Sequence, residues 1–115
     1  MTKDEARQLA YEKLVKEYDE FIKGVKQCDV DTVISMTYEI ELKKKVIHVI
    51  ALSDYSKPKY DLIIDSAITL EELYTGWISS TEKTVKTYVA HALKYKLEEE
   101  ILKKEARDYP KIWLM

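Results

Sequence analysis

The side chains that most often carry acid–base or metal chemistry are few in this chain. Only two histidines, His48 and His91, and one cysteine, Cys28, occur in its 115 residues. A zinc site needs several Cys, His or carboxylate ligands at short, regular spacing, and neither histidine has such neighbours. No paired nucleophile and base and no glycine-rich phosphate loop is visible either. We therefore expect no catalytic residues, no metal site and no cofactor, and we predict that the protein is not an enzyme.

Two runs of charge are the next candidates for a function. Lys43, Lys44 and Lys45 form a basic run, and Glu98–Glu100 followed by Lys103 and Lys104 form a mixed one. The formal net charge is only −2, and no aromatic residues interleave the lysines, so direct binding of nucleic acid is not expected. We predict that both runs are solvated helix faces. An acidic strip that imitates nucleic-acid phosphates is the alternative for Glu98–Glu100.

The C-terminal residues depart from the usual polar chain end. After Pro110, which cannot continue a helix, the chain closes with apolar side chains. Aromatic residues dominate the energetics of many protein interfaces. The candidate partner-binding residues are Tyr109, Ile112, Trp113 and Leu114. The segment 109–115 is therefore expected to be a distinct apolar tail that either packs on the core of this chain or contacts a partner.

The helix that is easiest to recognise in the sequence lies at the N-terminus. Thr2 and Glu5 have the spacing of a capping box, in which each side chain accepts a free backbone N–H at the start of a helix. Apolar residues then recur at helical spacing from Ala6 to Val25. The pattern predicts a helix that ends near Val25 or Lys26.

An unbroken row of apolar residues spaced four apart dominates the second segment. Its members are Val30, Ile34, Tyr38, Leu42, Val46 and Ile50. Residues at this spacing lie on one face of a helix, so the row predicts one helix over about 30–52, capped by Asp29, with a buried stripe that includes Tyr38. The alternation of apolar and polar residues over 33–42 is also typical of a strand, which is the alternative.

The remaining chain predicts three more helices. A loop over 53–59 precedes a short helix over 60–66, and Thr69 with Glu72 caps a short helix that runs to Ile78. Ser79 with Glu82 has the same spacing and predicts the start of a last long helix that ends near Asp108. We predict an all-α fold: a single small helical bundle over 1–115 with three long and two short helices, the long ones packed antiparallel.

Composition narrows the class of protein. Apolar residues make up 46% and charged residues 35% of the chain, as in globular proteins. No run approaches the roughly 20 apolar residues of a membrane span, and the charged N-terminus does not look like a signal peptide. We expect a cytoplasmic protein with no membrane contact.

Several segments together resemble a known family. These are Tyr11-Glu12-Lys13-Leu14 with Tyr18 and Phe21, Tyr38-Glu39-Ile40 before the lysines, and Leu70-Glu71-Glu72-Leu73-Tyr74 with Trp77. They resemble a small uncharacterised helical family of Firmicutes and their mobile elements, the domain of unknown function 3848, over roughly residues 9–78. The proline-containing start of that family's second helix is absent here. The resemblance implies a helical fold encoded on a phage, plasmid or integrated element, and it carries no catalytic residues.

These observations lead to a functional hypothesis. Small size, the absence of a catalytic pattern and the resemblance favour a non-catalytic protein–protein interaction module. Its specific form would be a mobile-element-encoded inhibitor of host defence of the anti-CRISPR type, whose partner is a bacterial defence effector such as a Cas nuclease. The alternative is a homodimeric scaffold or a nucleic-acid-associated regulatory protein.

Overall fold

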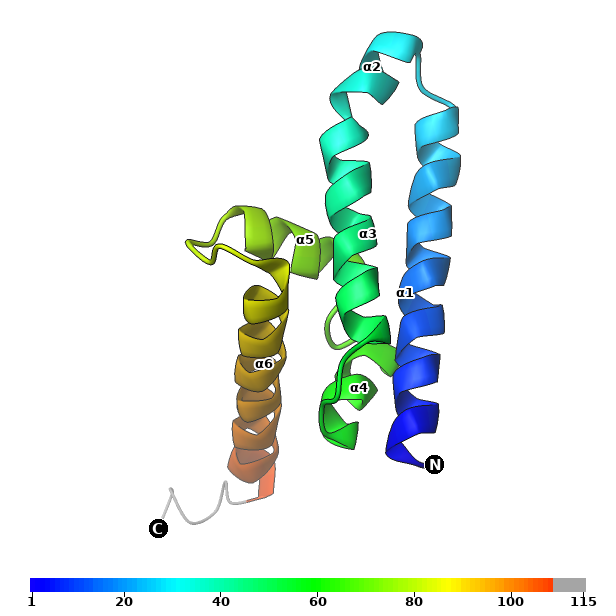
Figure 1. The fold of residues 1–115 in the computed structure, drawn as a ribbon. Coiled ribbons are helices and arrows are strands. Elements are labelled where there is room, and N and C mark those ends of the chain that lie inside the picture. Colours follow the sequence, from blue (N-terminus) through cyan, green and yellow to red (C-terminus); the bar gives the residue numbers. More distant parts are fainter. Residues whose placement is uncertain (109–115) are drawn as a thin grey trace.

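A computed structural model describes residues 1–108 of the chain, which form six helices and no strand (Figure 1). This confirms the all-α bundle and excludes the strand over 33–42. The helices are α1 (Lys3–Lys26), α2 (Val30–Ser35), α3 (Thr37–Ala51), α4 (Lys57–Ile64), α5 (Leu70–Ile78) and α6 (Val85–Asp108).

The long helices do not all run antiparallel. Figure 1 shows α1 and α3 side by side in opposite directions, as predicted, whereas α6 runs in the same direction as α3. The reason is the path of the two short helices. The chain leaves the end of α3 through α4, reaches the middle of α3 again at the start of α5, and begins α6 only after α5 has led away from α3 (Figure 1). The prediction for α6 was therefore wrong in direction.

The predicted helix over 30–52 is divided at Met36 into α2 and α3. The Met36 N–H is shared between the carbonyls of Thr32 and Val33, both at 3.1 Å. The hydroxyls of Ser35 and Thr37 also donate to backbone carbonyls, those of Thr32 and Val33. Such hydroxyls compete with the regular helical bonds and often bend a helix, which explains a break that apolar spacing did not reveal.

Helix starts follow the predicted caps in three of four places. The Asp29 carboxylate accepts the N–H of Thr32 at 2.8 Å at the start of α2. The hydroxyl of Thr2 accepts the N–H of Glu5 at 3.1 Å, and that of Thr69 accepts the N–H of Glu72 at 3.2 Å. The predicted cap at Ser79 was wrong, because Ser79 ends α5 by donating its own N–H to Thr75. Helix α6 begins later, where the hydroxyl of Thr84 accepts the N–H of Thr87 at 3.2 Å.

The first short helix also starts earlier than predicted. It begins at Lys57 rather than at residue 60, with Pro58 in its first turn. Proline is well suited to that position, since its missing N–H would have no helical partner there and its fixed φ matches a helix. Pro58 therefore belongs to the helix and not to the preceding loop.

The core lies where α1, α3, α4, α5 and the first half of α6 meet. Tyr60 of α4 is its largest fully buried side chain. The Tyr60 hydroxyl accepts the Tyr55 N–H at 2.9 Å and lies 2.7 Å from the Ser53 hydroxyl, so its polar atom is satisfied. The other core residues with no exposed surface are Ala6, Ala10, Leu14, Val46, Ile50, Ile63, Leu73, Val89 and Leu93.

A glycine allows α5 to approach α6 closely. A Cβ atom at Gly76 would lie 1.7 Å from the hydroxyl oxygen of Tyr88. Only a residue without a side chain leaves room for the Tyr88 ring against α5. This contact joins α6 to the rest of the bundle at the beginning of the helix.

Candidate functional site

The residues that could carry metal or acid–base chemistry are not gathered by the fold. Among the described residues, no group of three or more His, Cys, Asp or Glu side chains could hold a metal ion. His48 and His91 are both exposed, on α3 and α6. His91 lies 2.9 Å from Glu82 through its Nδ1 atom, and this pair joins the first half of α6 to the segment before it.

The predicted partner-binding residues Tyr109, Ile112, Trp113 and Leu114 lie outside the residues that the structure describes. The two readings of the tail therefore both stay predictions. None of the helices within 1–108 has the length and apolar content needed to cross a bilayer.

The lysine run is only partly solvated, contrary to prediction. Lys43 is buried, with 3% of its surface exposed, whereas Lys44 and Lys45 are exposed. The Lys43 ammonium lies 3.0 Å from Glu39 and 2.7 Å from Glu71. It also lies 3.6 Å from the centre of the Phe21 ring, a favourable cation–π geometry. Lys43 therefore joins α1, α3 and α5 at one point, which is a structural role that accounts for its charge.

The predicted buried stripe is buried over only half of its length. Leu42, Val46 and Ile50 are at most 5% exposed. By contrast Val30, Ile34 and Tyr38 are 73%, 65% and 70% exposed, so the prediction that Tyr38 belongs to the core was wrong. Figure 1 shows why: α5 meets α3 near its middle and leads away from α1, and the end of α3 that carries α2 extends beyond it. We call Val30, Ile34, Tyr38 and the exposed Ile78 the apolar tip.

A pocket of about 370 Å³ adjoins the apolar tip in the angle between α3 and α5. Tyr38 and Leu42 line it from α3, and Trp77 and Ile78 line it from α5. The loop that follows α5 contributes polar groups to its rim, namely Ser80, Glu82 and Lys83. An apolar hollow with a polar rim is the usual anatomy of a protein-binding surface. Large side chains that are exposed beside such a hollow mark an interaction site better than scattered ones do.

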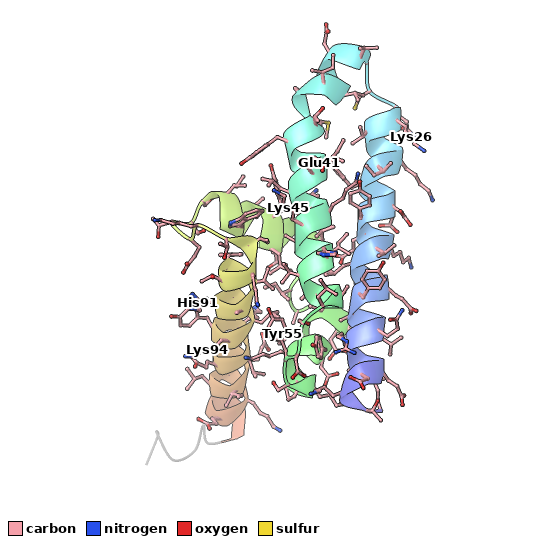
Figure 2. All side chains as sticks on the ribbon, in the orientation of Figure 1. Lys26, Glu41, Lys45, Tyr55, His91 and Lys94 are labelled. Carbon is pink, nitrogen blue, oxygen red and sulfur yellow. The ribbon has the colours of Figure 1, made fainter. Side chains whose placement is uncertain are left out.

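A second hollow runs between α3 and α6. Two adjoining pockets, of about 360 and 550 Å³, share His48 and Val49 and together form what we call the α3–α6 groove. Figure 2 shows Lys45 and Tyr55 between the two helices, and His91 and Lys94 on the opposite side of α6. The lining residues are Glu41, Lys44, Lys45, His48, Val49, Leu52, Ser53, Asp54, Tyr55, Val85 and Lys86.

The apolar side of α6 is covered only at its beginning. Val89 and Leu93 have no exposed surface, whereas Ile101 and Leu102, which we predicted on the same buried side, are 48% and 65% exposed. In the mixed run, Glu98, Glu99, Lys103 and Lys104 are exposed as predicted, whereas Glu100 is half-buried. The Lys103 ammonium lies 3.0 Å from the Glu99 carboxylate. The Lys103 ammonium lowers the pKa of the Glu99 carboxyl through a hydrogen bond and its charge.

Comparison with known proteins returns nothing: no protein family, no curated protein and no solved structure matches the chain. The resemblance to the domain of unknown function 3848 therefore stays a hypothesis that rests on the segments quoted above.

The sequence did not indicate either hollow. Both depend on where α5 and α6 begin, and the start of α6 was predicted several residues too early. One signal was available for the apolar tip. Ser35 and Thr37 interrupt the apolar row with residues that favour caps and turns over helix interiors, which could have suggested two helices.

Proposed function

We propose that the protein is a non-catalytic binding module whose partner is another protein and whose contact surface is the apolar tip with its adjoining pocket. One observation carries this proposal. Val30, Ile34 and Tyr38 are each at least 65% exposed, although they belong to the same four-residue row of the sequence as Leu42, Val46 and Ile50, which are buried farther along α3. Exposing such side chains to water costs free energy that a partner's apolar surface would recover.

The geometry suits a partner with a protruding apolar side chain. The pocket between Leu42, Trp77 and Ile78 would receive it, while Tyr38 would pack over it. Trp and Tyr are the residues most enriched among energetically dominant interface positions. Glu82 and Lys83 at the rim offer one charge of each sign for orientation.

The resemblance supplies the finer form of the proposal. A mobile-element protein of this size without a catalytic pattern would act in the cytoplasm as a stoichiometric inhibitor of host defence, of the anti-CRISPR type, by covering a surface of an effector such as a Cas nuclease. A homodimeric scaffold or a nucleic-acid-associated regulator is the alternative. Inhibition of DNA cleavage by purified Cas nucleases at molar equivalence would favour the first form.

A pair of tyrosine variants tests the contact surface. Tyr38→Ala changes the apolar tip, and Tyr95→Ala removes an equally exposed tyrosine, 63% against 70%, from α6. We expect affinity capture from a bacterial lysate to recover a protein with the unmodified chain and with Tyr95→Ala but not with Tyr38→Ala. Circular dichroism should show both variants folded. Equal capture by all three would reject the apolar tip, and a dimer that Tyr38→Ala dissociates in sizing chromatography would favour the scaffold.

A further inference from the structure

The charge of the α3–α6 groove is not balanced within the described residues. Its two carboxylates already have partners, since Glu41 lies 3.5 Å from Lys44 and Asp54 is paired with Lys3. Lys45 on α3 and Lys86 on α6 line the groove from its two sides. Neither makes an ion pair with any side chain that the structure describes, and both are exposed. The groove therefore offers two positive charges that a ligand could pair with.

Between these lysines the groove is mainly apolar. Val49 lies at its centre, where the two pockets meet, and Tyr55 and Leu52 line the end beyond it. Leu52 is 74% exposed, the largest exposed fraction among the large apolar side chains of the described chain. A groove between two helices, apolar along its length and charged on its walls, is the arrangement that receives an amphipathic helix.

The chemistry of the lining distinguishes a peptide from a nucleic acid. Phosphate recognition commonly uses arginine forks, and no arginine lines the groove. Its aromatic rings are the Tyr55 phenol and the His48 imidazole, too few for a row of stacked bases. The net charge of −2 gives no general attraction for a polyanion. An occupant with a few carboxylates and a few aliphatic side chains satisfies the groove better.

We propose that the α3–α6 groove binds an acidic amphipathic helical segment of a partner protein. Carboxylates of the segment pair with Lys45 and Lys86, and its aliphatic side chains cover Leu52 and Tyr55. This site is independent of the apolar tip, because the pocket at the tip and the groove share no lining residue. A protein with both surfaces can contact two segments of one partner or two partners at once.

The first experiment uses the full chain labelled with nitrogen-15 and a synthetic peptide as the probe. The peptide has about 15 residues, enough for a helix to form on binding, with leucines at i, i+3 and i+4 spacing and glutamates beside them. We expect saturable shifts of the amide signals of Val49, Leu52, Tyr55 and Lys86 in NMR spectra. A matched peptide with glutamine in place of every glutamate should bind at least about tenfold more weakly, because the charge-assisted bonds are lost.

A pair of variants on α6 tests the site itself. Lys86 and Lys94 are both exposed lysines of α6, but only Lys86 lines the groove, and Lys94 lies on the opposite side of the helix in Figure 2. Lys86→Glu should weaken peptide binding at least about tenfold, and Lys94→Glu should weaken it less than about twofold, although both change the net charge equally. Tyr38→Ala should leave peptide affinity unchanged, which separates this proposal from that for the apolar tip.

Three results would overturn the proposal. The first is the absence of saturable shifts with the acidic peptide. The second is an equal loss of affinity in Lys86→Glu and Lys94→Glu, which would show attraction without a site. The third is a set of shifts at the groove that a DNA or RNA duplex produces at lower concentration than the peptide, which would make the groove a nucleic-acid site.

Discussion

The row of apolar residues spaced four apart extends over both ends of the α1–α3 pair, but other helices cover it at one end only. At one end, Val46 and Ile50 of the four-residue row have no exposed surface, since they belong to the core in which α1, α5 and α6 pack against α3. At the other end, Ile34 and Tyr38 of the same row are 65% and 70% exposed. The spacing of apolar residues decides which face of a helix they share, whereas burial depends on a second layer. That layer ends where α5 meets α3.

The largest effect that separates the two ends is the loss of an isoleucine side chain. Ile50→Ala removes a fully buried side chain and should lower the free energy of unfolding by about 3 kcal/mol, through lost burial and a residual cavity. Ile34→Ala, at a residue 65% exposed, should cost less than about 0.5 kcal/mol. Urea denaturation followed by circular dichroism measures both.

Equal costs would contradict the comparison. They would mean that the apolar tip is covered in solution by a second copy of the chain. In that case the midpoint of unfolding would depend on protein concentration, which the same denaturation series can show.

How far the sequence predicts this molecule depends on the range of the interactions. The capping boxes at Thr2 and Thr69 were predicted correctly because each is a local contact between residues three apart. The same spacing at Ser79 and Glu82 gave a wrong prediction, because α5 extends up to Ser79 and uses it as its C-terminal cap. The exposure of Tyr38 could not be predicted, because it depends on where along α3 the helix α5 packs. Lys43 is similar: its partner Glu71 is distant in sequence, so a run of three lysines gave no sign that its first member is buried.

The second place to test is Lys43, which lies on α3 between the covered end and the exposed end. Lys43→Ala should cost about 2 kcal/mol, because it removes the cation from Glu39 and the Phe21 ring and leaves Glu71 unpaired. The expected loss is below that of a fully buried ion pair because Glu71 is 61% exposed. Lys44→Ala is the matched control on the adjacent residue, with an expected loss below about 0.5 kcal/mol. Similar losses in thermal denaturation would make the basic run a solvated face after all.

Two tyrosine hydroxyls, one at the covered end and one at the apolar tip, allow the same comparison with a smaller expected effect. Tyr60→Phe removes the oxygen that accepts the Tyr55 N–H and contacts Ser53, and should cost about 1–2 kcal/mol because a partly buried N–H loses its partner. Tyr38→Phe removes an exposed hydroxyl and should change the free energy of unfolding by less than about 0.3 kcal/mol. A loss for Tyr38→Phe as large as that for Tyr60→Phe would show that the Tyr38 hydroxyl is also engaged.

The smallest expected effect lies within the packed end, at a carboxylate of α1. One oxygen of Glu17, Oε2, is buried without a hydrogen-bond partner. Burial raises the pKa of the Glu17 carboxyl above its ordinary value, and the nearby Lys13 ammonium and Leu70 N–H only partly offset this. A raised pKa means that the folded state holds the proton more tightly than the unfolded state. The contribution of Glu17 to stability is therefore greatest at low pH and is lost as the pH rises through the folded-state pKa.

Glu17→Gln keeps the shape of the side chain and removes this dependence on pH. The variant and the unmodified chain should unfold at the same temperature well below the ordinary glutamate pKa of 4.5. Above it the variant should become the more stable of the two, by no more than about 0.5 kcal/mol because the group is partly open to solvent. Asp19→Asn, at an exposed residue of the same helix, controls for the loss of one negative charge. Thermal denaturation from about pH 3 to 7, a window of about four units that spans the carboxylate pKa, measures the difference. If Glu17→Gln were instead the less stable protein at neutral pH, the Lys13 ammonium and the Leu70 N–H would outweigh burial, and the packed end would contain no unfavourable charge.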